Sequence, residues 1–174
     1  MAQVTVVIPF YNSDLYIVTA VKSVIDQTYG DWQLFLINDG STDNSKCMIT
    51  PFLNDSRIKL LEFEENQGQS MALNLGLNHT DTPYFLALDG DDWLYPNSLE
   101  LLVSEMEKST EDIGVIGGNI NIVWEYKKNK YHSRIVSRPF YDKYEFLLAN
   151  QSVWPRFFRT SVLKKVGGWS TNDP

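Results

Sequence analysis

The sequence predicts an α/β fold in which a mostly parallel central sheet is covered by helices on both faces. Strand-like and helix-like segments alternate four times in the first half of the chain, an order that favours parallel strands joined by right-handed crossovers. Residues 4–8 and 85–88 are apolar almost throughout, which is typical of strands buried on both faces. Three of the expected strands end at residues 9–12, 38–43 and 89–92, and these ends should converge on one edge of the sheet, where open α/β sheets bind ligands.

The first strand and helix are predicted over residues 4–8 and 15–27. Pro9 is expected to end the strand because proline cannot donate to the hydrogen-bond ladder. The helix is indicated by apolar residues at one-turn spacing, namely Ile17, Val21, Val24 and Ile25. Later elements of this half are expected over residues 33–37 (strand), 44–53 (helix, shortened or kinked by Pro51), 57–63 (strand), 69–78 (helix, weakened by Gly76) and 85–88 (strand).

The second half is more mixed. A helix should follow Pro96, with Asn97 as its cap, Glu100 completing a capping box, and one buried stripe formed by Leu99, Leu102, Val103 and Met106. Strands are expected over residues 113–116, 120–124, 131–136 and 153–158, the last carrying Trp154, and helices over residues 141–148 and 161–166.

Composition limits the possible functions. The chain has 174 residues, enough for one domain, and a formal net charge of −7 without a dense basic run, which disfavours a nucleic-acid surface. The single Cys47 fits a reducing compartment, so the cytoplasm is expected. No apolar run approaches the roughly 18 residues needed to span a bilayer, so no integral membrane segment is expected.

The stretch LDGDDW places Asp89, Asp91 and Asp92 within four residues at the end of a strand. Three close carboxylates repel one another unless a cation lies between them, and hard oxygen ligands suit Mg²⁺ or Mn²⁺. The alternative is a solvated acidic turn that merely stops the strand. The loops after the other strands carry Tyr11 and Asp39, an aromatic platform and an acceptor for a ring N–H. Together the three loops suit a nucleoside diphosphate.

Five motifs in order resemble those of family 2 glycosyltransferases with the GT-A fold. They are VTVVIPFYNSDLYI, SVIDQTYGDWQLFLINDGSTD, ENQGQSMALNLGL, LALDGDDWLYP and KKVGGW, and the stretch PFLNDSRIK is similar to bacterial spore-coat polysaccharide-type members. The resemblance implies a Rossmann-like three-layer sandwich and an inverting transfer from a nucleotide-sugar donor, with UDP as the expected nucleotide. It also implies a glycan or lipid-linked acceptor, a role in cell-surface polysaccharide synthesis, and a location in the cytoplasm or at the inner face of the membrane.

The resemblance assigns roles to individual residues. Tyr11 corresponds to the aromatic that stacks on the base, Asp39 to the acceptor for the uracil imide N–H, and Pro9 shapes the same loop. Asp89 corresponds to the acid near the ribose and the metal, and Asp91 to the metal ligand.

Two further side chains are candidates for contacts with donor or acceptor. Asp92 lies beside the metal ligand, and Trp154 could stack on an acceptor sugar, although a half-buried tryptophan in a sheet is an equal alternative. Asp39 could instead cap the helix that follows it, and Tyr11 could be an ordinary core or surface aromatic.

Two departures from the family pattern stand out. Leu73 precedes Asn74 where many members have an arginine, so a cation near the diphosphate is missing and the helix start at Gln69 should help to meet the phosphates. The general base is expected beyond Pro174, which makes the chain one truncated GT-A domain, with a nucleotide-binding half over residues 1–95 and an incomplete acceptor-side half over residues 96–174. Alternatives are a nucleotide-binding but catalytically incomplete domain and, less favoured, a haloacid-dehalogenase-like phosphatase.

Overall fold

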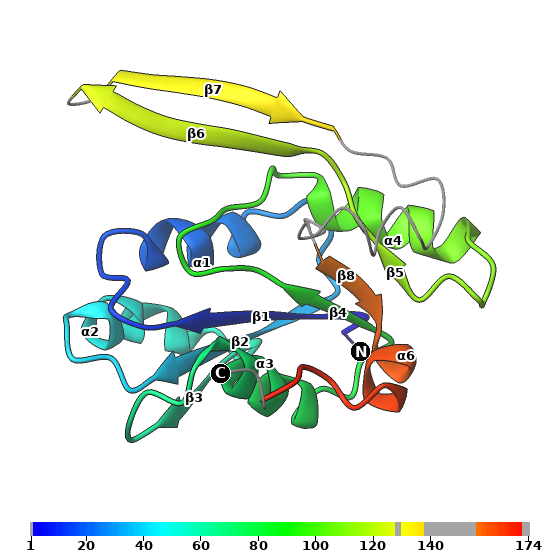
Figure 1. Ribbon diagram of the computed structural model, residues 1–174, viewed down its shortest axis with the longest axis horizontal. Coiled ribbons are helices and arrows are strands. Elements are labelled where there is room, and N and C mark those ends of the chain that lie inside the picture. The colour runs from blue at the N-terminus through cyan, green and yellow to red at the C-terminus, as the bar shows by residue number, and fades with distance from the viewer. Residues whose placement is uncertain (1, 128–129, 138–155, 172–174) are drawn as a thin grey trace.

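A computed structural model describes residues 2–127, 130–137 and 156–171. Its main sheet has six strands in the order β3-β2-β1-β4-β8-β5 (Figure 1). The strands are β1 (Val4–Phe10), β2 (Trp32–Asp39), β3 (Ile58–Phe63), β4 (Tyr84–Ala87), β5 (Val115–Ile116) and β8 (Arg156–Arg159). The first four pair in parallel, whereas β8 is antiparallel to both β4 and β5. The predicted α/β fold with a mostly parallel sheet is therefore confirmed.

Helices cover both faces of this sheet. The helical elements are α1 (Ile17–Ile25), α2 (Ser45–Ile49), the 3₁₀ helix η1 (Thr50–Asn54), α3 (Gln69–Asn78), α4 (Ser98–Lys108) and α6 (Thr160–Lys165). One hydrophobic core lies between the sheet and α1 and α4, and a second lies between the sheet and α3 and α6. None of the helices in the described ranges is long and apolar enough to cross a membrane.

The first strand continues through Pro9, contrary to the prediction that proline would end it. Val7 accepts a hydrogen bond from Leu88 N on the side of β4 (3.0 Å). Backbone groups alternate sides along a strand, so Pro9 also faces that side, beyond the last residue of β4. Its missing N–H therefore costs no ladder bond, and pairing with β2 continues to Phe10.

Several local predictions had mixed outcomes. The predicted stripe of α4, Leu99, Leu102, Val103 and Met106, is buried, but Asn97 makes no side-chain cap, and Glu100 accepts from Thr28 instead (2.9 Å). The helix expected over 44–53 is divided at Thr50, with Pro51 in the first turn of η1.

Gly76 has a packing role in α3. A Cβ at this position would lie 2.6 Å from Val7 Cγ1, so the missing side chain is what allows the helix to pack closely against β1.

A separate antiparallel hairpin is formed by β6 (Ile120–Lys127) and β7 (Lys130–Val136). It lies above α1 and the loop that follows β4 in the view of Figure 1. The predicted strands at 120–124 and 131–136 correspond to this pair. The helix predicted over 141–148 and Trp154 lie outside the described residues.

Candidate nucleotide-sugar site

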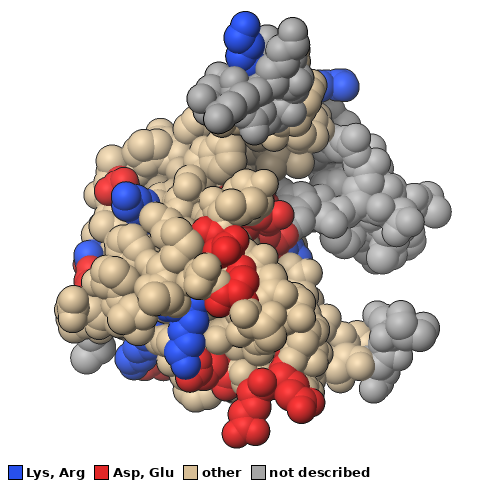
Figure 2. All heavy atoms as spheres, turned by 90° about the vertical axis from the view of Figure 1, so that its left-hand side faces the viewer, with Lys and Arg blue, Asp and Glu red and all other residues tan. Residues whose placement is uncertain are grey.

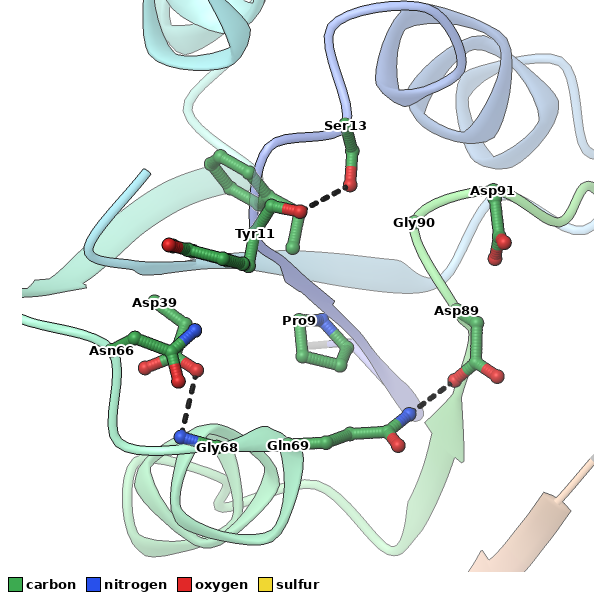
Figure 3. A pocket seen from close by; sticks show the side chains of 11 residues that line it. Pro9, Tyr11, Ser13, Asp39, Asn66, Gly68, Gln69, Asp89, Gly90 and Asp91 are labelled. Carbon is green, nitrogen blue, oxygen red and sulfur yellow. Dashed lines mark hydrogen bonds between the residues drawn. The ribbon is translucent and has the colours of Figure 1, made fainter. Parts of the chain in front are cut away.

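The carboxyl ends of β1, β2 and β4 meet at one pocket of about 350 Å³ (Figure 3). Its lining includes five of the residues singled out from the sequence, namely Pro9, Tyr11, Asp39, Asp89 and Asp91. Asp39 and Asn66 lie at one end, Asp89 and Asp91 at the other, and Pro9 between them. The topology places these side chains together because the three strands are parallel neighbours in the sheet.

Asp39 is 4% exposed and ends β2. Its two carboxylate oxygens accept hydrogen bonds from Gln67 N (2.7 Å) and Gly68 N (2.9 Å), immediately before α3. It does not cap the helix that follows NDGSTD, since Asp43 accepts from Ser45 N there (2.9 Å). Each oxygen of Asp39 has further acceptor capacity, so the residue can hold the loop and still accept from a ligand.

Tyr11 is 47% exposed and lines the pocket. The next residue, Asn12, has a φ of 50°, a left-handed conformation that asparagine tolerates. Its Oδ1 accepts from Thr42 N (2.9 Å) and Asp43 N (3.3 Å). These bonds join the loop after β1 to the loop after β2, so they fix the backbone from which Tyr11 projects.

Gly90 lets the acidic loop pass close to the loop after β1. A Cβ there would lie 3.1 Å from Phe10 Cβ and 3.2 Å from the Pro9 carbonyl oxygen. A residue with a Cβ would require the two loops to separate by a few tenths of an ångström.

Asp89 is held by two partners. Its Oδ1 accepts from Gln69 Nε2 (2.8 Å), at the first residue of α3, and from Arg156 Nη2 (2.9 Å), at the start of β8. Burial raises the pKa of Asp89 to about 6; Arg156 opposes this rise, and Asp92 and Asp91 add to it. The site therefore leaves its negative charge incompletely compensated.

Asp92 shows the same imbalance. Burial and then Asp91 raise its pKa, against the opposing effect of Arg156. Asp92 does not line the pocket of Figure 3; together with Asp91 it lines a second cavity next to it. Figure 2 shows acidic side chains gathered at the centre of the face seen from the left of Figure 1.

The acidic end fits a cation that is partly coordinated by a ligand. Within the described part of the chain, no three Asp, Glu, His or Cys side chains are placed to form a cation cage. Asp91 and Asp89 nevertheless line the same pocket. Mg²⁺ and similar ions commonly use one or two carboxylates together with substrate phosphates, so the donor set suits such an ion.

Arg156 is the main site residue that sequence reasoning missed. Its side chain is 18% exposed and reaches Asp89 only because β8 inserts antiparallel beside β4. No local sequence pattern signals that pairing. Leu73, the position at which a cation was expected, is 1% exposed in the core between α3 and the sheet, so this position faces away from the pocket.

Residues 5–167 match the family model described as "Glycosyl transferase family 2". The chain belongs to this family. Family 2 membership agrees with the resemblance carried by the five motifs and leaves the phosphatase alternative without support.

Two curated relatives illustrate the family likeness. Glycosyltransferase GlyG of Streptococcus pneumoniae is 34% identical over 119 residues, covering 68% of this chain and 39% of GlyG. The UDP-Glc:alpha-D-GlcNAc-diphosphoundecaprenol beta-1,3-glucosyltransferase WfgD of Escherichia coli is 36% identical over 120 residues, covering 69% of this chain and 46% of WfgD. The chain thus spans less than half the length of either relative.

Solved glycosyltransferase structures share the fold. Staphylococcus aureus TarS 1-349 superposes with a TM-score of 0.76 at 20% identity, covering 99% of this chain and 51% of that one. The mannosyltransferase PcManGT from Pyrobaculum calidifontis, in complex with GDP-Man and Mn²⁺, gives a TM-score of 0.73 at 20% identity, covering 98% of this chain and 48% of that one. The fold is GT-A.

Proposed function

We propose that this chain is the nucleotide-sugar-binding domain of a metal-dependent, inverting glycosyltransferase that acts in cell-surface polysaccharide synthesis. The observation that carries the proposal is the pocket itself. It places an aromatic and a buried carboxylate at one end, two acids at the other, and the first residue of α3 along its wall. A nucleoside diphosphate has matching parts in the same order: a flat base, then a ribose, then charged phosphates.

At the base end, Tyr11 offers a flat face for stacking and Asp39 offers an acceptor. We assign UDP as the donor nucleotide because the uracil imide N–H can donate to Asp39. UDP is also consistent with the name of WfgD and with the solved complexes of TarS with UDP and with UDP-GlcNAc. The complex of PcManGT with GDP-Man makes GDP the competing nucleotide to test.

At the diphosphate end, Asp91 and Asp89 would hold Mg²⁺ or Mn²⁺. Such an ion stabilises the negative charge of the departing diphosphate. The N-terminus of α3, a helix of ten residues, lies along the wall between the two ends and contributes a dipole that favours the phosphates. Arg156 and Gln69 hold the Asp89 carboxylate in position against the pocket.

In the transfer, a hydroxyl oxygen of a glycan or lipid-linked acceptor forms a bond to the anomeric carbon of the donor sugar. The bond from that carbon to the diphosphate oxygen breaks, and its electron pair leaves with the nucleoside diphosphate. The hydroxyl proton passes to a general base, which we place outside the described residues. The names of WfgD and of the teichoic acid poly(glycerol phosphate) polymerase of Staphylococcus epidermidis support a cell-surface product.

The decisive test is a thermal-shift measurement with UDP, GDP and no nucleotide, each with Mn²⁺ and with EDTA. At a nucleotide concentration about 100-fold above its Kd, UDP with Mn²⁺ should raise the melting temperature by roughly 5–10 °C. The rise with EDTA should be clearly smaller. Equal shifts with Mn²⁺ and EDTA would remove the metal assignment, and no shift with any nucleotide would remove the proposed function.

Asp91→Ala should abolish the Mn²⁺-dependent part of that shift while leaving the melting temperature of the free protein within about 1 °C, because Asp91 is exposed. Asp26→Ala is the matched control, since Asp26 is also exposed and lies away from the pocket. If both variants keep the Mn²⁺ effect, Asp91 is not the metal ligand.

A further inference from the structure

A second cavity, of about 610 Å³, adjoins the nucleotide pocket. It lies between the loop that follows β4 and the β6–β7 hairpin, and Asp91 lines both cavities. Its volume is within the usual range for small-molecule sites, roughly 300–1,000 Å³. A ligand in this cavity could therefore reach the acidic end of the nucleotide pocket without entering the base end.

Aromatic side chains from three parts of the chain line this cavity. Trp93 and Tyr95 come from the loop after β4, Tyr131 from β7, and Tyr16 from the start of α1. All four are substantially exposed, with Trp93 at 48%. Large aromatics left open on the wall of a cavity offer flat apolar faces to a ligand and stabilise little of the fold.

Polar groups accompany the aromatic faces. Asn121 Nδ2 donates to Tyr95 Oη (2.8 Å), which connects the hairpin to the loop after β4. The buried Oδ1 of Asn121 has no hydrogen-bond partner among the described residues. Asp92 and Ser98 add further hydrogen-bonding groups to the lining. A ligand hydroxyl inserted beside Tyr95 would supply the donor that Asn121 lacks.

We propose that this cavity is the acceptor subsite and that it binds the pyranose ring of the acceptor sugar, with Trp93 as the stacking platform. The proposal rests on the proposed function, because only transfer gives the chain a second sugar to bind. A pyranose has an apolar C–H face that packs on an aromatic ring and a rim of hydroxyls that needs donors and acceptors. The lining combines these two features, and its junction with the nucleotide pocket at Asp91 brings an acceptor hydroxyl towards the donor.

Trp124 provides a matched control. It lies on β6 of the same hairpin and is 46% exposed, close to the value for Trp93, but it does not line the cavity. Its ring instead packs beside that of His132, with 5.9 Å between the two ring centroids. Replacing Trp124 therefore removes an equally large exposed indole without touching the proposed subsite.

The test uses the full chain with isotope-labelled tryptophan, titrated with the methyl glycosides of glucose, N-acetylglucosamine and mannose while the indole N–H resonances are recorded. At least one glycoside should shift the Trp93 resonance. Trp93→Ala should weaken its binding by about tenfold or more, Trp93→Phe should weaken it less, and Trp124→Ala should change it by less than about twofold. The Trp93 variants should keep the UDP–Mn²⁺ thermal shift, which also shows that they fold.

Three outcomes would overturn the subsite. The first is that no glycoside shifts the Trp93 resonance. The second is an equal loss of glycoside binding in Trp93→Ala and Trp124→Ala. The third is displacement of the bound glycoside by UDP-glucose but not by UDP, which would assign the cavity to the donor's own sugar. Failure of the UDP–Mn²⁺ shift in the unmodified chain would instead count against the proposed function, and the glycoside titration can be judged separately from it.

Discussion

Among the site residues, Asp89 shows most clearly that the acidic end of the pocket carries negative charge that the protein does not fully balance. It is partly buried beside two other acids, and one of its oxygens accepts from both Gln69 and Arg156, yet its pKa is raised to about 6. A single guanidinium therefore does not offset the desolvation and repulsion that this carboxylate experiences. A cation bound in the pocket would relieve the same imbalance.

This gives a pH-dependent prediction for the metal-free chain. In the folded chain the pKa of Asp89 lies above the ordinary value of 3.8, so folding disfavours its charged form. The free energy of unfolding is therefore higher at low pH, where Asp89 is protonated, and falls as pH rises through about 6. Measured in EDTA, the melting temperature of Asp89→Asn minus that of the unmodified chain should rise between pH 4 and pH 7. Asp26→Asn controls for the removal of one charge from a chain of net charge −7. A difference that stays constant with pH would contradict the assignment.

At the scale of elements, the contact between α3 and β1 determines where the helix begins relative to the pocket. Gly76→Ala should destabilise the fold, although alanine is the better helix former by about 1 kcal/mol. The added Cβ would lie 2.6 Å from Val7 Cγ1, and overpacking of this kind costs about 1–3 kcal/mol. Urea unfolding measures the change.

The double variant Val7→Ala, Gly76→Ala separates packing from helix propensity. Removing the two methyl groups that meet the new Cβ should make Gly76→Ala much less costly than it is alone. An unchanged cost in the Val7→Ala background would show that the close approach of α3 to β1 is not the cause.

The two loops joined by Asn12 form a second element-scale unit. Asn12→Gly keeps the left-handed backbone but removes the acceptor that Thr42 N and Asp43 N use. Because these groups are exposed, stability should fall by only about 0.5–1.5 kcal/mol. The affinity for UDP should fall more clearly, by several-fold in calorimetric titration, because the backbone that carries Tyr11 is released. Thr42→Ala keeps the backbone bond and should bind UDP normally; equal losses in both variants would refute the role of Asn12.

At the scale of the whole molecule, the sequence predicted the first half more closely than the second. The turn formed by residues 66–68 placed the start of α3 at its observed position. Periodicity identified every buried residue in the stripe of α4, because local spacing determines which face of a helix is buried. Strand ends predicted which residues meet in the pocket, since parallel order fixes which edge they share. The extension of β1 through Pro9 was missed because it depends on where the neighbouring β4 ends.

The residues that the second half of the chain contributes to the two cavities are brought there by contacts between positions far apart in the sequence. Arg156 reaches Asp89 across 67 residues of sequence, and Asn121 reaches Tyr95 from a separate hairpin. No periodicity or turn motif encodes either contact. The second cavity could therefore be recognised only in three dimensions, although Trp93 and Tyr95 directly follow the acidic motif in the sequence.

The position of β8 has a consequence for the order in which the protein forms during its synthesis. Until residues 156–159 leave the ribosome, β4 pairs only with β1 and presents an open edge, and Asp89 has no guanidinium beside it. The early chain thus carries an unprotected strand edge next to unbalanced acids, a state prone to wrong pairing. A divalent cation present at that stage would offset the repulsion between the acids before the late strand arrives, so the metal proposed for the finished domain would also assist its folding.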